Sequence, residues 1–176
     1  MSMSSTIGRA LRPVLLSCIL LSATGAVQAQ DRPNPDKVAR GAYLVGILGC
    51  GDCHTAGAMA GRPDTARLLG GSDVGWQVPG LGTFVGPNLT PDRDTGLGAW
   101  TDAEIVKALR TGVRPDGRQL APVMPYMGYS RMTDADAGAI IAYLRSLTPV
   151  SGAVPGPFGP TEKPTLPYFA LTMPGK

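Results

Sequence analysis

Apolar residues recur every three or four positions in three separate stretches of the chain, the spacing of the buried face of an amphipathic helix. The first stretch follows Asp36, whose carboxylate suits the positive end of a helix dipole. The second follows Thr101 and Glu104, a capping-box signal, and ends at Gly112, which favours a left-handed helix stop. The third follows Thr133, with an aspartate three positions later as a similar start. The predicted buried positions are, in order, Val38, Ala42, Val45 and Ile47 or Leu48; Ile105, Val106 and Leu109; and Ile140, Ile141, Tyr143, Leu144 and Leu147.

The stretches between and after these helices have no helical period. Residues 50–100 contain many glycines and four prolines, which predicts a long loop. Residues 151–176 form a Pro-rich C-terminal tail with six prolines. This tail either lies along the domain by Phe158, Tyr168 and Phe169 or folds only against a partner.

The first 29 residues have the pattern of a secretory signal peptide. Arg9 and Arg12 precede an apolar run over residues 14–23, and small residues follow, with expected cleavage after Ala29. Ten apolar residues are too few to span a bilayer comfortably. Cys18 lies inside the apolar run rather than at its end, which disfavours lipid attachment. We therefore expect a periplasmic protein that meets membranes only through its partners.

Composition and charge fit one ordinary globular domain. The 176 residues are 43% hydrophobic and 16% charged. The signal segment holds two of the 16 basic residues and none of the 13 acidic ones, so the mature chain is close to neutral. Because no run of Lys and Arg remains, the sequence offers no electrostatic footprint for nucleic acid.

The sequence GCGDCHT places Cys50, Cys53 and His54, the last being the only histidine of the chain, within five positions. A structural zinc site needs four protein ligands, and the mature chain has no further thiol or imidazole. A redox CxxC normally lies near a strand-helix-strand pattern, which is missing here. A plain disulfide beside a satisfied histidine leaves the position of the histidine unexplained. Covalent haem attachment is favoured because CxxCH uses all three side chains together: each thiol forms a thioether to the porphyrin, and the imidazole reaches the iron.

A haem iron with one histidine needs a second axial ligand, and methionine is the natural candidate because there is no second histidine. Each methionine can equally be core filler. Met132 directly precedes a predicted helix N-cap, where an apolar residue commonly packs onto the first turn. Met124 lies between Pro122 and Pro125, which stiffen its loop, whereas Met127 has no such rigid setting. We predict Met124 as the ligand, with Met127 and then Met132 as the alternatives, ahead of Met59 and Met173.

Three motifs in order, "RGAYLVGILGCGDCHT", "GPNLTPDRDTGLGAWTDAEIVKALRTGVRPDGRQLAPVMPY" and "RMTDADAGAIIAYLRSL", make residues 36–150 resemble the class I c-type cytochromes. Within that class the chain is similar to the monohaem domains in cytochrome c subunits of periplasmic alcohol, gluconate and aldehyde dehydrogenases. Those subunits usually carry three such domains, whereas this chain has one CxxCH. The resemblance implies an all-α class I cytochrome c fold over residues 30–150, with a few short helices and long loops wrapped around one covalently bound haem.

The resemblance also implies roles for two further residues. Pro87 matches the proline whose carbonyl accepts a hydrogen bond from the proximal histidine. Trp100 matches the tryptophan whose indole N–H binds a haem propionate, although packing in the core with the N–H on a backbone carbonyl is a competing interpretation. Arg114 and Arg118 either reach a propionate or lie solvated in their loop.

These features predict an electron-transfer protein rather than an enzyme. An iron held by His54 and Met124 has no vacant position for substrate. We expect it to accept electrons from a periplasmic dehydrogenase and to pass them towards a terminal oxidase or another cytochrome. Two alternatives remain: a haem enzyme or gas-binding protein with an open sixth position, and a structural cytochrome subunit docked to a dehydrogenase through its tail.

Overall fold

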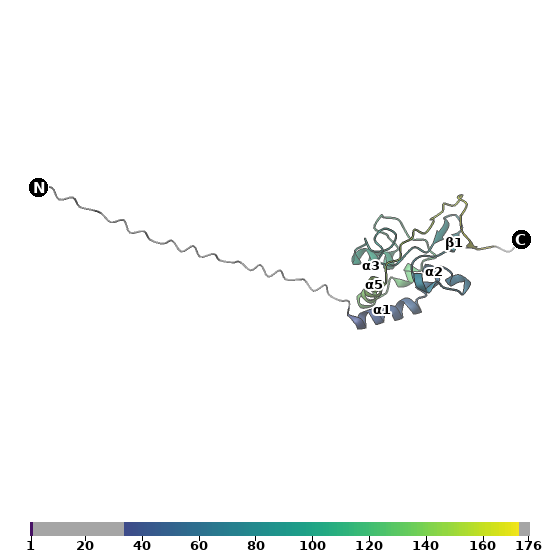
Figure 1. Cartoon of the computed structure of the whole chain (residues 1–176). Coiled ribbons are helices and arrows are strands. Elements are labelled where there is room, and N and C mark those ends of the chain that lie inside the picture. Colours follow the sequence, from purple (N-terminus) through teal and green to yellow (C-terminus); the bar gives the residue numbers. More distant parts are fainter. Residues whose placement is uncertain (2–33, 173–176) are drawn as a thin grey trace. The chain divides into compact units, whose positions relative to one another are not determined.

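The computed structural model describes residue 1 and residues 34–172, and the predicted signal peptide lies outside the described residues apart from Met1. Three helices carry the core: α1 (Pro35–Ile47), α3 (Asp102–Thr111) and α5 (Asp134–Ser146). Two short helices, α2 (Cys50–His54) and α4 (Tyr126–Tyr129), and two 3₁₀ turns, η1 (Ala58–Ala60) and η2 (Thr65–Arg67), lie in the connections. The predicted helical stretches are confirmed, and Figure 1 shows α1 and α5 running alongside each other.

The helix ends follow from local capping chemistry. Asn34 accepts hydrogen bonds from the backbone N–H groups of Asp36 and Lys37 at the start of α1. The predicted Thr101–Glu104 capping box is present in full, and Gly112 ends α3 in the left-handed conformation with φ 72°. At α5 only half of the expected box forms: Thr133 accepts from the Asp136 N–H, while the Asp136 carboxylate pairs with Arg40 of α1 at 3.0 Å.

The core lies where α1, α3 and α5 meet. Its buried apolar residues include Leu44 and Val45 of α1, Ile105 of α3 and Leu144 of α5. The predicted stripes are largely confirmed, although Val38, Ala42, Tyr143 and Leu147 are half-buried rather than buried. Ile47 is 60% exposed, so Leu48 takes the inward position. Ala108 is buried on α3, whereas the predicted Val106 and Leu109 are half-buried. Packing of the three helices fixes the end of α1 and the start of α2, because Leu48 and Cys50 pack against this core.

Gly41 allows α1 to approach α5 closely. A side chain at position 41 would collide with the backbone carbonyl of Ala139 and with Tyr143. No atom lies near the corresponding position at Gly46. The missing side chain at Gly41 therefore permits the close contact between the two helices, whereas Gly46 has no such role.

The stretch predicted as a long loop contains a small β-sheet. Strands β1 (Gly75–Val78) and β2 (Gly82–Val85) form an antiparallel hairpin. Strand β3 (Tyr168–Ala170), from the Pro-rich tail, pairs parallel with β1, so the sheet order is β2-β1-β3. The prediction of an uninterrupted loop over residues 50–100 was wrong for α2, η1, η2 and the hairpin, because elements of three to five residues give too short a pattern to detect. Of the two arrangements considered for the tail, the structure has the one along the domain.

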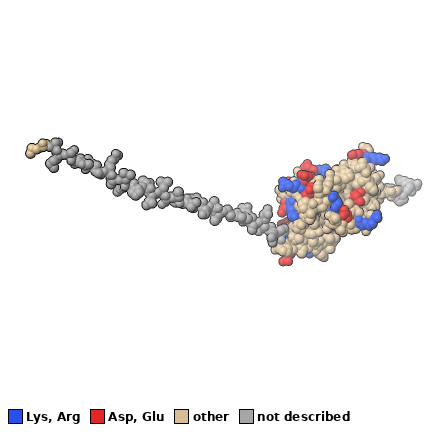
Figure 2. All heavy atoms as spheres, in the orientation of Figure 1, with Lys and Arg blue, Asp and Glu red and all other residues tan. Residues whose placement is uncertain are grey.

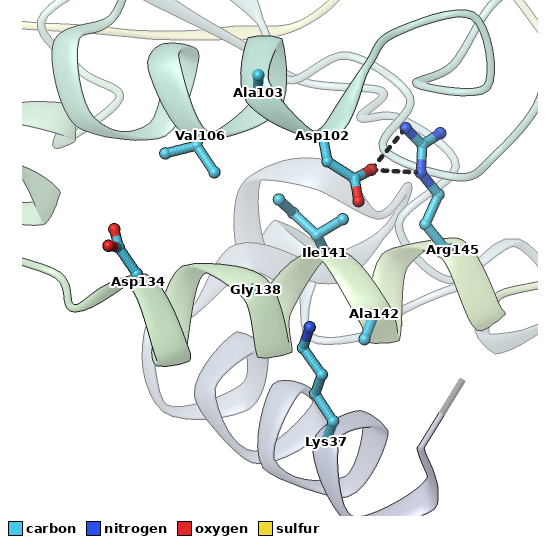
Figure 3. A pocket seen from close by; sticks show the side chains of 9 residues that line it. All are labelled: Lys37, Asp102, Ala103, Val106, Asp134, Gly138, Ile141, Ala142 and Arg145. Carbon is cyan, nitrogen blue, oxygen red and sulfur yellow. Dashed lines mark hydrogen bonds and ion pairs between the residues drawn. The ribbon is translucent and has the colours of Figure 1, made fainter. Parts of the chain in front are cut away.

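A shallow groove of about 400 Å³ opens where the three core helices face solvent (Figure 3). The Asp102 carboxylate and the Arg145 guanidinium form an ion pair at its rim, at 3.1 Å, and Lys37 reaches across from α1. No helix in the described part of the chain is long and apolar enough to cross a membrane.

Candidate haem site

The motif GCGDCHT folds into a single helical turn directly after α1. Gly49 adopts the left-handed conformation, with φ 65°, and this breaks the chain direction between α1 and α2. Positions i, i+3 and i+4 share one face of a helix, so Cys50, Cys53 and His54 project together. The spacing of the three residues in the sequence therefore places their side chains on one face of the helical turn.

These side chains line a cavity of about 540 Å³ whose walls are mostly apolar. The walls come from every part of the domain: α1, α2, the β-hairpin, α3, the loop before α4, α5 and the tail. All six residues predicted for the site line it: Cys50, Cys53, His54, Pro87, Trp100 and Met124. The structure therefore brings together segments that are more than a hundred residues apart in sequence.

His54 is buried and fixed by one hydrogen bond. Its ring Nδ1 lies 2.7 Å from the Pro87 carbonyl oxygen, which can only accept, so Nδ1 carries the proton. Burial lowers the pKa of the imidazole, and the Pro87 carbonyl opposes this shift. The neutral tautomer therefore leaves Nε2 with a free lone pair for a metal.

Gly86 makes this contact possible. A side chain at position 86 would collide with the backbone carbonyl of Cys53, the residue next to His54. Next to Pro87, Asn88 is 2% exposed and ties its loop together: its Oδ1 accepts from the Thr90 N–H at 2.9 Å. Sequence reasoning did not single out Gly86 or Asn88, although both lie in the quoted segment GPNLT.

Cys50 and Cys53 are free thiols rather than a disulfide. Burial raises the pKa of Cys50 to about 11. The pKa of Cys53 is also raised, first by burial and then by the neighbouring Asp52 carboxylate. The described residues contain no cluster of three or more His, Cys, Asp or Glu side chains that could hold a metal ion.

Among the methionines in the described part of the chain, only Met124 lines the cavity. Its backbone is held in a turn, since its N–H donates to Ala121 and its carbonyl accepts from Tyr126. Met127 is 67% exposed, and Met132 packs against the core beside the start of α5. Met59 lies in η1, away from the cavity lining, and Met173 lies outside the described residues.

Two arginines, Arg114 and Arg118, line the cavity together with Trp100. The Arg114 guanidinium lies over the Trp100 ring, 5.0 Å from its centroid, and bonds Asp116 at 3.3 Å. Arg118 also lines the cavity, and its pKa is lowered by burial and by the nearby Arg114. The Trp100 ring lines the cavity and also packs against the core. Two cations at an apolar cavity favour an anionic group between them.

Several cavity residues had no sequence signal. Trp76 of β1 and Tyr129 of α4 line the cavity, and so does the tail from Ala153 to Pro157. Trp76 also packs against Phe169 of β3, with ring centroids 5.0 Å apart. No local pattern in the sequence marks either Trp76 or the tail as part of the site.

The donor set and the cavity fit a haem. Two thiols and one imidazole with a free Nε2 converge on one wall, a thioether lies elsewhere on the lining, and arginines are available for carboxylates. Most of the remaining wall is apolar, which suits a porphyrin face.

The cytochrome c family model matches residues 38–148 of the chain. The chain is 35% identical to the fructose dehydrogenase cytochrome subunit of Gluconobacter japonicus, over 91% of this chain and 31% of that protein. It is 38% identical to the cytochrome c subunit of a quinone alcohol dehydrogenase of Gluconacetobacter polyoxogenes, over 75% of this chain and 26% of that protein. It is 34% identical to the gluconate 2-dehydrogenase cytochrome c subunit of Pantoea cypripedii, over 79% of this chain and 30% of that protein. The chain thus matches less than a third of the length of each of these relatives.

Proposed function

The chain belongs to the cytochrome c family, and on that premise we propose that it carries single electrons through one haem c whose axial ligands are His54 and Met124. A cytochrome c domain holds haem covalently, and Cys50, Cys53 and His54 form the CxxCH motif for that attachment. When bound, this group supplies one-electron ferric–ferrous chemistry. The observation that supports the ligation is that one apolar cavity is lined by both His54 and Met124.

The residues of the chain act on this site in distinct ways. The Pro87 carbonyl holds the imidazole in the tautomer that can ligate and makes it a better donor. The apolar walls exclude water, and exclusion of water together with a thioether ligand raises the reduction potential. Trp100 and Arg114 lie where they can bind propionate carboxylates.

The expected donor is a dehydrogenase, and the acceptor is a terminal oxidase or another cytochrome. Support for the donor comes from the relatives, whose names describe cytochrome subunits of fructose, alcohol and gluconate dehydrogenases. The segment with signal-peptide character over residues 1–29 supports a periplasmic location. On the face shown in Figure 2, acidic and basic side chains are interspersed, and nothing there resembles the basic stripe of a nucleic-acid-binding protein.

The ligation is tested by optical spectroscopy of the oxidised holoprotein. A thioether on ferric haem gives a weak sulfur-to-iron band in the far red, and Met124→Ala should abolish it. Met127→Ala and Met132→Ala are matched controls and should retain the band, since neither side chain lines the cavity. Retention of the band in Met124→Ala would show that another methionine is the ligand.

A wild-type protein without the far-red band would favour the alternative of an open sixth position. Carbon monoxide binding to the reduced protein then separates the two cases. A carrier with both axial positions filled should bind carbon monoxide slowly or not at all, whereas Met124→Ala should bind it readily. Ready binding by the wild-type protein would contradict the carrier proposal.

A further inference from the structure

We propose that the tail segment from Val150 to Phe158 forms one wall of the haem cavity, where it excludes water from the haem and helps to set the reduction potential. The proposal rests on the haem site described above. Ala153, Val154, Pro155, Gly156 and Pro157 line the same cavity as Cys50, Cys53 and His54. The segment therefore contributes five consecutive residues to the site although it follows the last core helix.

The start of the segment is tied to the loop that orients the histidine. Asn88 donates from Nδ2 to the Val150 carbonyl at 2.6 Å, and the Val150 N–H donates to Thr90 Oγ1 at 3.0 Å. Both Asn88 and Thr90 are almost completely buried, and Asn88 directly follows Pro87, whose carbonyl bonds His54. Anchoring at Val150 thus stabilises the same loop that fixes the imidazole.

The end of the segment is anchored on the hairpin. The backbones of Phe158 and Thr83 exchange two hydrogen bonds, each of 2.9 Å, and the Phe158 side chain is 6% exposed. A buried aromatic ring with two backbone bonds is a firm attachment. Residues 153–157 therefore span the cavity between two fixed points.

Two glycines, Gly71 and Gly82, leave room for the tail segment where it packs against the rest of the domain. A side chain at Gly71 would collide with the Val154 methyl group, and one at Gly82 would collide with the Phe158 carbonyl. Both glycines have positive φ, 107° and 122°, in the region that favours glycine. The absence of a side chain at both glycines therefore allows the tail segment to pack closely against the domain.

Solvent exposure and nearby charge are two ways in which a protein sets haem potential. Val154 is half-buried in the wall, so a carboxylate there would lie close to the haem and stabilise the ferric state. We expect Val154→Asp to lower the midpoint potential of the holoprotein, and Val154→Asn, of similar size but uncharged, to lower it less. Leu171→Asp is the control: Leu171 is 69% exposed in the same tail and does not line the cavity, so its substitution should leave the potential unchanged.

A second measurement tests whether the tail segment limits the access of small molecules to the iron. Phe158→Ala weakens the anchor by removing its buried ring, and imidazole added to the oxidised holoprotein should then bind the iron faster than in the wild-type protein. Mass measurement of attached haem confirms that each variant is mature, which separates this proposal from the proposed function. If Val154→Asp carries haem but has the wild-type potential, or if Phe158→Ala carries haem but binds imidazole at the wild-type rate, the segment is not a wall of the site. If no haem attaches even to the wild-type chain, the proposed function fails instead.

Discussion

A single arginine of α5 fixes the chain segment that presents Trp100 to the cavity. The Arg145 guanidinium donates to the carbonyls of Leu97, at 2.8 Å, and Trp100, and it pairs with Asp102 at 3.1 Å. Leu97 and Trp100 both line the cavity. Because only 26% of the Arg145 side chain is exposed, its bonds to the two carbonyls are more valuable than its bond to the solvent-facing carboxylate.

Arg145→Met should therefore destabilise the protein by about 3–6 kcal/mol, because two bonds from a charged donor are lost, at about 1.5–3 kcal/mol each. Asp102→Asn is the matched variant, and it should cost less than about 1 kcal/mol, as exposed ion pairs do. Urea unfolding of both variants measures the difference. Equal costs would mean that the ion pair, rather than the carbonyl contacts, carries the stabilisation.

At the scale of elements, α1 and α5 form the contact on which the haem site is built. Their close approach depends on Gly41, whereas Gly46 on the same helix faces open space. Gly41→Ala should destabilise the protein by about 1–3 kcal/mol, the usual cost of overpacking. Gly46→Ala should stabilise it by about 0.5–1 kcal/mol, because alanine favours a helix over glycine. Thermal unfolding of the two variants checks the opposite signs, and the same sign for both would contradict the packing described.

The elements that could be predicted from sequence are those with local signals. Thr101, Glu104 and Gly112 mark α3 at both ends, and the CxxCH spacing by itself places three side chains on one helical face. The pairing of β3 with β1 could not be predicted in this way. It joins residues more than ninety positions apart over three residue pairs, and only tertiary packing of the tail fixes its register.

The same reasoning applies to the site. Cys50, Cys53 and His54 follow from one motif, whereas only the stiffness of the nearby prolines distinguishes Met124 from the other four methionines that follow the predicted signal peptide. Trp76 and Val154 enter the cavity because distant segments pack there, and neither has a neighbour in sequence that reports on the haem. Residues whose role depends on long-range packing are the ones that sequence reasoning misses.

At the scale of the whole molecule, charge balance determines how the protein would associate with the proposed redox partners. Residues 30–176 contain 14 basic and 13 acidic side chains, and both signs are mixed on the face shown in Figure 2. Electrostatic steering needs a surface with an excess of one sign. Association with a dehydrogenase should therefore depend on apolar and shape complementarity more than on long-range attraction.

The prediction is a weak dependence of electron-transfer rate on salt. Association without steering has rate constants of about 10⁵–10⁶ M⁻¹s⁻¹, against about 10⁸–10⁹ M⁻¹s⁻¹ for steered pairs at low salt. Stopped-flow reduction of the holoprotein by a purified quinone-dependent dehydrogenase, from low to high ionic strength, should change the second-order rate constant by less than about tenfold. A steep fall with salt would instead point to a local charged contact, and Arg114→Gln and Arg118→Gln would then show whether the two arginines at the cavity provide it.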